Sequence, residues 1–145
     1  MNSKIVWKEA MQFDATSGDH HVLMDAKAPI GKGLGYTPKE LVLAGIAGCT
    51  AMDVIALLRK YKQDVKSFTV ESNAEQTTGS HPVVFKNVSI IFNLEGTIEP
   101  SKAIEAVRLS QTQYCGVSAM ISKSVPIDYT VILNGEEIGT GQAAF

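Results

Sequence analysis

The feature that most constrains the fold is an apolar segment near the middle of the chain. Residues 41–58 (LVLAGIAGCTAMDVIALL) contain one charged side chain, Asp53. Just before them, Thr37 and Glu40 have the spacing of a capping box, and Pro38 suits a first helical turn. The sequence therefore predicts a helix of about 25 residues, roughly 38 Å long. A helix that is apolar almost all round must be buried on most sides.

The same segment is long enough to be considered as a membrane span. Its length lies at the lower edge of the range for a span. Asp53 would cost about 2.5–3.5 kcal/mol at the centre of a bilayer. Gly45 and Gly48 interrupt the segment, and the flanking residues have the alternating pattern of water-exposed sheet. We therefore predict a core helix and no membrane partner.

The remainder of the chain alternates between strand-like and helix-like patterns. Pro100 opens a second helical segment that Gly116 interrupts, and Asn134-Gly135 is typical of a tight turn after a last strand. The order strands, long helix, hairpin, helix, strand predicts one α+β domain over residues 1–145 with a mainly antiparallel sheet. The predicted strands are residues 4–13, 20–25, 65–75, 83–94 and 126–133.

Composition excludes several classes of protein. The formal net charge is -2, so no basic excess indicates nucleic acid or an anionic membrane as a partner. Two cysteines cannot form a disulfide-rich scaffold or fill a four-ligand zinc site alone. The first residues lack a long apolar region, which predicts no secretory signal and favours a reducing cytoplasm.

Two cysteines could carry thiol chemistry, and one carboxylate lies close enough in the sequence to affect it. Cys49 lies in the middle of the apolar helix, where a buried core residue is the common interpretation. Cys115 lies beside Gly116 at a predicted helix break, where unpaired backbone N–H groups favour a reactive thiol. Asp53 lies four residues after Cys49 on the same helix face. Its charge disfavours a thiolate at Cys49 unless a cation intervenes, and a polar contact to a loop or a partner subunit is the other interpretation.

The remaining polar candidates are weaker. The segment 31–35 (GKGLG) lacks the full phosphate-loop pattern and favours a flexible loop, from which Lys32 could point into a site. Glu40 could hold a catalytic cation or only cap the long helix. His20 and His21 are adjacent on a strand and face opposite sides. We therefore predict no metal site and no cofactor.

Three segments carry a resemblance to a known family. Residues 37–53 (TPKELVLAGIAGCTAMD) resemble the central-helix motif of the OsmC/Ohr family, the osmotically inducible and organic-hydroperoxide-resistance proteins. Residues 114–118 (YCGVS) resemble its second motif, and residues 81–85 (HPVVF) resemble an OsmC-like branch. The resemblance implies an OsmC-like α+β fold, with antiparallel sheets packed around the long helix. It also implies an intertwined homodimer whose sites lie at the subunit interface.

The resemblance further implies a thiol peroxidase. Cys49 would attack an organic hydroperoxide and become a sulfenic acid. Cys115 would convert that acid to a disulfide, which a dithiol reductant would reopen. Spacing alone gives no reason to pair these two cysteines, so the pairing depends on the resemblance.

One residue of the resembled peroxidases has no counterpart at the expected place. They use an Arg from the N-terminal half, held by a Glu, whereas the first Arg here is Arg59. Lys27 or Lys32 could supply the charge and Glu40 could hold it. Two functions stay open: a hydroperoxide reductase, and an OsmC-like dimer that binds a small apolar ligand or has another thiol-based role. A third and weaker possibility is a dimer with a purely structural role.

Overall fold

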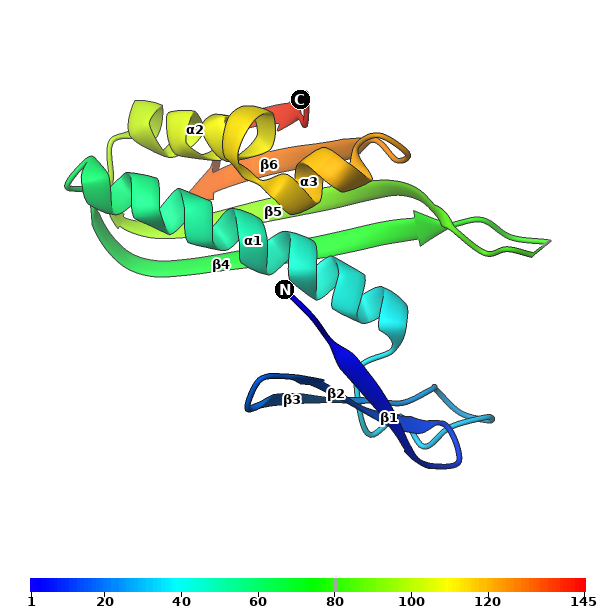
Figure 1. The fold of residues 1–145 in the computed structure, drawn as a ribbon. Coiled ribbons are helices and arrows are strands. Elements are labelled where there is room, and N and C mark those ends of the chain that lie inside the picture. Colours follow the sequence, from blue (N-terminus) through cyan, green and yellow to red (C-terminus); the bar gives the residue numbers. More distant parts are fainter. Residues whose placement is uncertain (80) are drawn as a thin grey trace. The chain divides into compact units, whose positions relative to one another are not determined.

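The computed structural model describes residues 1–79 and 81–145, which divide into two compact units, Met1–Val42 and Leu43–Phe145. The N-terminal unit contains an antiparallel sheet of three strands, β1 (Lys4–Glu9), β2 (Gln12–Ser17) and β3 (His20–Met24). These strands are labelled in Figure 1. The prediction of one strand over residues 4–13 is wrong, because a turn at Ala10 folds the segment into a hairpin. Glu9, where the apolar alternation fails, marks the end of β1.

The glycine-rich loop after β3 is organised around a buried carboxylate. Asp25 is 2% exposed and accepts backbone N–H bonds from Ala26 (2.8 Å), Lys32 (3.2 Å) and Leu34 (3.2 Å). Burial raises the pKa of Asp25, but these bonds outweigh it and hold the pKa below its usual value. The loop therefore wraps around an internal carboxylate, and a Cβ at Gly31 would collide with backbone.

The predicted long helix is α1 (Pro38–Lys60), and its capping box is confirmed. The backbone N–H of Thr37 donates to Glu40 Oε2 (2.8 Å), and the N–H of Glu40 donates to Thr37 Oγ1 (3.4 Å). By length and composition α1 is the one helix in the described chain that could cross a membrane. Within the chain it packs one stripe of side chains onto the sheet of the C-terminal unit.

Burial along α1 differs from the prediction. Within one chain, a single stripe of α1 with four-residue spacing is buried. The prediction that the helix is buried on most sides is therefore wrong for a single chain. The opposite side is exposed and largely apolar, and Met52 is 74% exposed. The buried stripe consists of Ile46, Thr50, Val54 and Leu58. The exposed residues of α1 between its first turn and its C-terminal cations are Val42, Ala44, Gly45, Gly48, Met52 and Ala56.

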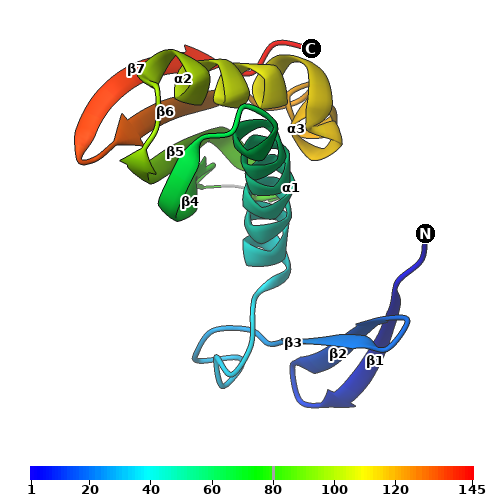
Figure 2. The same ribbon diagram turned by 90° about the vertical axis from the view of Figure 1, so that its left-hand side faces the viewer.

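The C-terminal unit is a four-stranded sheet with helices packed against one face, as Figures 1 and 2 show. The strands are β4 (Asp64–Gln76), β5 (Phe85–Thr97), β6 (Ile127–Leu133) and β7 (Glu136–Gln142), in spatial order β4-β5-β6-β7. Alternate side chains of β5 and β6 form one buried core with α1 and α2 (Pro100–Leu109).

The connection between β5 and β6 gives the sheet its one parallel pair; the other described pairs are antiparallel. Parallel neighbours need a long crossover, which here is α2, a π-helical turn η1 (Ser110–Tyr114) and α3 (Gly116–Ile121). The α+β class is confirmed, and this crossover is what carries Cys115 to the helical face of the sheet.

The last strand, β7, does not follow from the apolar pattern. Its sequence EEIGTGQ has no regular alternation. The signal for it is the Asn134-Gly135 turn, where both residues have positive φ (51° and 85°), as a tight hairpin requires.

Candidate functional site

Cys49 lies midway along α1, next to the buried stripe. Its side chain is half-buried, and its neighbour Thr50 is fully buried. The thiol therefore lies at the edge of the core.

Cys115 lies where the second helical segment changes course. After α2 the chain widens into the π-helical turn η1, and Cys115 then caps α3. The backbone N–H of Ser118 donates to Cys115 Sγ (3.3 Å). Burial raises the pKa of the fully buried Cys115, while the Ser118 N–H and hydroxyl oppose that rise. The predicted helix break is thus present.

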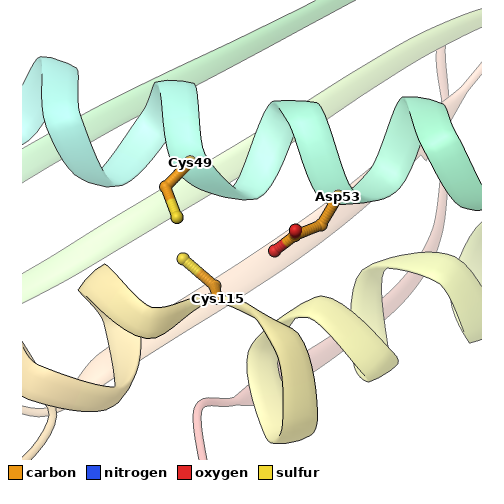
Figure 3. A group of neighbouring side chains, drawn as sticks. All are labelled: Cys49, Asp53 and Cys115. Atoms are coloured by element: carbon orange, nitrogen blue, oxygen red, sulfur yellow. The ribbon is translucent and has the colours of Figure 1, made fainter.

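The fold brings these two thiols and one carboxylate together. Cys49 Sγ, Cys115 Sγ and an oxygen of Asp53 all lie within 4.8 Å of one another. Figure 3 shows the two sulfurs directed toward each other, with the Asp53 carboxylate beside them. Cys49 and Asp53 come from one face of α1, and Cys115 comes from the break before α3. The structure therefore pairs two cysteines whose sequence spacing gave no reason to pair them.

The charge beside the thiols is acidic. Burial raises the pKa of Asp53, and the hydrogen bond from Ser110 Oγ to Asp53 Oδ2 (3.0 Å) partly opposes this rise. Neither the burial nor the Ser110 hydrogen bond places a positive charge beside Asp53. Among the described residues no ion pair involves Asp53, and neither arginine takes part in one. Asp53 thus makes a polar contact with η1 and also lies beside both thiols.

A buried hydrogen-bond chain holds this carboxylate. Gln111 Nε2 donates to Thr50 Oγ1 (2.8 Å), and Thr50 Oγ1 lies 2.7 Å from Ser110 Oγ. Because Ser110 gives its proton to Asp53, the Thr50 hydroxyl must donate to Ser110. The donors of this hydrogen-bond chain all point from Gln111 toward Asp53. Ser110 donates to one Asp53 oxygen and not to the other. It also joins α1 to η1.

These network residues did not emerge from the sequence. Thr50 lies in the apolar segment 41–58, and Ser110 and Gln111 lie in the second helical segment, without a motif that marks any of the three. The π-helical turn is what directs Ser110 and Gln111 inward, and π-turns are frequent at functional sites. A buried Thr beside a Cys is the one weak signal available.

The other predicted site residues lie in the N-terminal unit. Lys27 Nζ lies 2.6 Å from Glu40 Oε1, and Lys32 Nζ lies 3.1 Å from Glu9 Oε1. Of the two candidate lysines, it is therefore Lys27 that Glu40 holds. Lys27 and the Thr37 capping bonds lower the pKa of Glu40 to about 2. Glu40 thus both caps α1 and binds a cation, the two roles that sequence reasoning left open.

The fold and the facing thiols define a small α+β dithiol protein. A family model described as OsmC-like protein matches residues 31–130. Protein YhfA of Escherichia coli strain K12 is 32% identical over 137 residues, which cover 90% of this chain and 96% of YhfA. The chain therefore belongs to the OsmC-like family, as the sequence motifs predict.

Solved structures agree with this assignment. An OsmC-like protein from Mycoplasma pneumoniae has a TM-score of 0.81 at 13% identity, covering 91% of this chain and 95% of that chain. An organic hydroperoxide resistance protein from Legionella pneumophila has a TM-score of 0.63 at 16% identity, covering 91% and 94%. At these identities the likeness establishes the fold, and the OsmC-like architecture is confirmed.

Val has nearly the same shape as Thr, so Thr50→Val should break the hydrogen-bond chain with little change in packing. Gln111 Nε2 would lose its partner in the core, so Thr50→Val should lower the free energy of unfolding by about 1–3 kcal/mol. Thr112→Val is the matched control: its exposed hydroxyl donates to the Arg108 carbonyl, and its effect should stay within about 0.5 kcal/mol. Chemical denaturation measures both. Equal losses of unfolding free energy in the two variants would contradict the buried hydrogen-bond chain.

Acid should loosen the start of α1 through Glu40. Because the folded-state pKa is about 2 against an ordinary 4.5, the stabilisation is complete above pH 4.5 and is lost as pH falls through about 2. The protection of the Thr37 amide hydrogen against exchange, measured by NMR relative to the intrinsic exchange rate at each pH, should fall over that interval. In Glu40→Gln, whose amide oxygen cannot titrate, that pH dependence should be absent. A wild-type profile flat down to pH 2 would contradict the assignment.

Proposed function

We propose that this protein is a thiol-dependent peroxidase that reduces organic hydroperoxides with Cys49 and Cys115. The observation that carries the proposal is the approach of the two sulfurs to within 4.8 Å in a chain of the OsmC-like family. Structural neighbours from Legionella pneumophila and Elizabethkingia anophelis are named organic hydroperoxide resistance proteins, which supports the same chemistry.

The first proposed step uses the half-exposed thiol. The Cys49 thiolate attacks one peroxide oxygen, the O–O bond breaks, and the other oxygen leaves as an alcohol after taking up a proton. Cys49 is then a sulfenic acid. Cys49 is the better nucleophile of the pair because Cys115 is fully buried and its pKa is raised.

The second step uses the buried thiol. Cys115 attacks the Cys49 sulfur, an S–S bond forms, and the hydroxyl of the sulfenic acid leaves as water with the Cys115 proton. A dithiol then reduces the disulfide. The facing sulfurs, drawn in Figure 3, require little rearrangement for this step.

The proposal includes a cation and a partner copy. Lys27 and Glu40 form the described ion pair whose residue types correspond to the Arg and Glu of the resembled peroxidases. A homodimer would cover the exposed apolar side of α1, including Val42 and Met52. Such a face costs free energy when it is left in water.

The alternative is a dimer that binds a small apolar molecule without turning it over. A hollow of about 560 Å³ in the N-terminal unit supports this alternative. This volume is within the usual range for small-molecule sites. Its lining is part apolar and part polar: His21, Val22, Leu23, Gly33, Leu34, Gly35, Tyr36 and Glu40.

Peroxide consumption tests the proposed chemistry. Reduced protein, cumene hydroperoxide, a dithiol and a metal chelator should consume peroxide well above the rate of the dithiol alone. Cys49→Ser should fall to that background rate. Cys115→Ser should retain one rapid turnover and accumulate a sulfenic acid that dimedone traps. A wild-type rate equal to the background would exclude the peroxidase and leave the binding alternative.

A charge on the exposed side of α1 should separate the proposed dimer. Met52→Lys places an ammonium in the apolar face, so sedimentation equilibrium should show a shift from dimer to monomer. Val84→Lys is the control, an exposed apolar residue (49%) outside α1, and should leave the dimer intact. A wild-type monomer, or a Met52→Lys variant that stays dimeric, would contradict this assembly.

A further inference from the structure

The dithiol site gathers three groups that can each carry a negative charge. Cys49, Cys115 and Asp53 converge within 4.8 Å, and no described cation pairs with them. A positive charge beside a peroxide-reactive cysteine stabilises its thiolate, whereas a nearby carboxylate destabilises the thiolate. The peroxidase chemistry therefore does not account for Asp53. A bound cation would.

The spacing of the three groups fits a tetrahedral metal ion. Zn–S bonds of about 2.3 Å and a Zn–O bond of about 2.1 Å place ligand atoms about 3.6–3.8 Å apart. The three atoms already lie within 4.8 Å of one another, so shifts of about 1 Å or less bring them to that spacing. Their side chains converge on one point in Figure 3.

Neighbouring groups already support the three as ligands. Ser110 Oγ donates to one oxygen of Asp53 and leaves the other available, as is usual for a ligating carboxylate. The Ser118 N–H donates to Cys115 Sγ. The Ser118 hydroxyl is fully buried and hydrogen-bonds to no other described group, so it can donate to a thiolate at Cys115, whose pKa it lowers.

We propose that Cys49, Cys115 and Asp53 form a three-ligand site for a thiophilic divalent cation, with Zn²⁺ as its occupant. Two sulfurs select a soft or borderline ion over Mg²⁺ or Ca²⁺. Cys49 and Asp53 are only half-buried, so a fourth coordination position opens away from the core. Three protein ligands with one open position are typical of exchangeable or catalytic zinc rather than of structural zinc.

Binding and peroxide chemistry compete for the same thiols. Zn²⁺ takes both sulfurs as thiolates and releases their two protons, with no change in oxidation state. The disulfide has no thiolate to offer, so only the reduced protein binds. The metal would hold the thiols out of reach of peroxide until it is removed. Binding is measured without peroxide, whereas the peroxidase assay contains a chelator, so each proposal can fail without the other.

Metal titration of the reduced full-length protein tests the site. Competition with a chromophoric chelator should give one Zn²⁺ per chain, and Co²⁺ should give the thiolate charge-transfer band of a sulfur-ligated tetrahedral ion. Cys49→Ser and Cys115→Ser should each abolish that band or weaken it severely. Asp53→Asn, which keeps the shape, should lower Zn²⁺ affinity at least tenfold. Ser110→Ala should lower it about 10- to 100-fold.

The control is Asp64→Asn, which removes an exposed carboxylate paired with Lys66 and should leave the affinity unchanged. Diamide-oxidised protein should not bind. Absence of stoichiometric binding to the reduced chain overturns the proposal. So does binding that Asp53→Asn leaves unchanged, because the thiols alone would then account for it. Circular dichroism of each variant checks that it is folded.

Discussion

The buried hydrogen bond between Thr50 and Ser110 is the contact on which the site depends. It joins the central helix to the π-helical turn at the point where the two cysteines approach each other. Pairing the two buried hydroxyls avoids the free-energy cost of leaving both polar groups unsatisfied in the core. The bond therefore ties α1 to the helical crossover beside Cys49, Asp53 and Cys115, within the apolar core that packs these elements together.

The charge beside the two thiols is negative, and it limits what chemistry the site favours. Its thiols face a carboxylate, and the lysine that Glu40 holds belongs to the N-terminal unit. An acidic neighbour disfavours thiolate formation but favours the capture of a cation. The same geometry therefore favours the proposed cation site over a permanently activated thiolate.

Much of the architecture was predictable because it depends on local patterns. The capping box, the apolar segment and the proline and glycine positions predicted α1 and the break at Cys115. Prediction failed where the signal was weak. The β1–β2 hairpin was missed because its turn at Ala10 has no glycine, and β7 was missed because it has no regular apolar alternation.

The sequence by itself determined the α+β class, the long helix, its N-terminal cap and the two cysteines, because each depends on residues close together in the chain. Only the tertiary structure decided that the cysteines face each other, that Asp53 joins them, and that Glu40 holds Lys27 rather than Lys32. It also decided that one side of α1 stays uncovered in a single copy. These outcomes depend on how distant segments pack, and an apolar helix pattern does not specify which of its sides meets the sheet and which stays exposed.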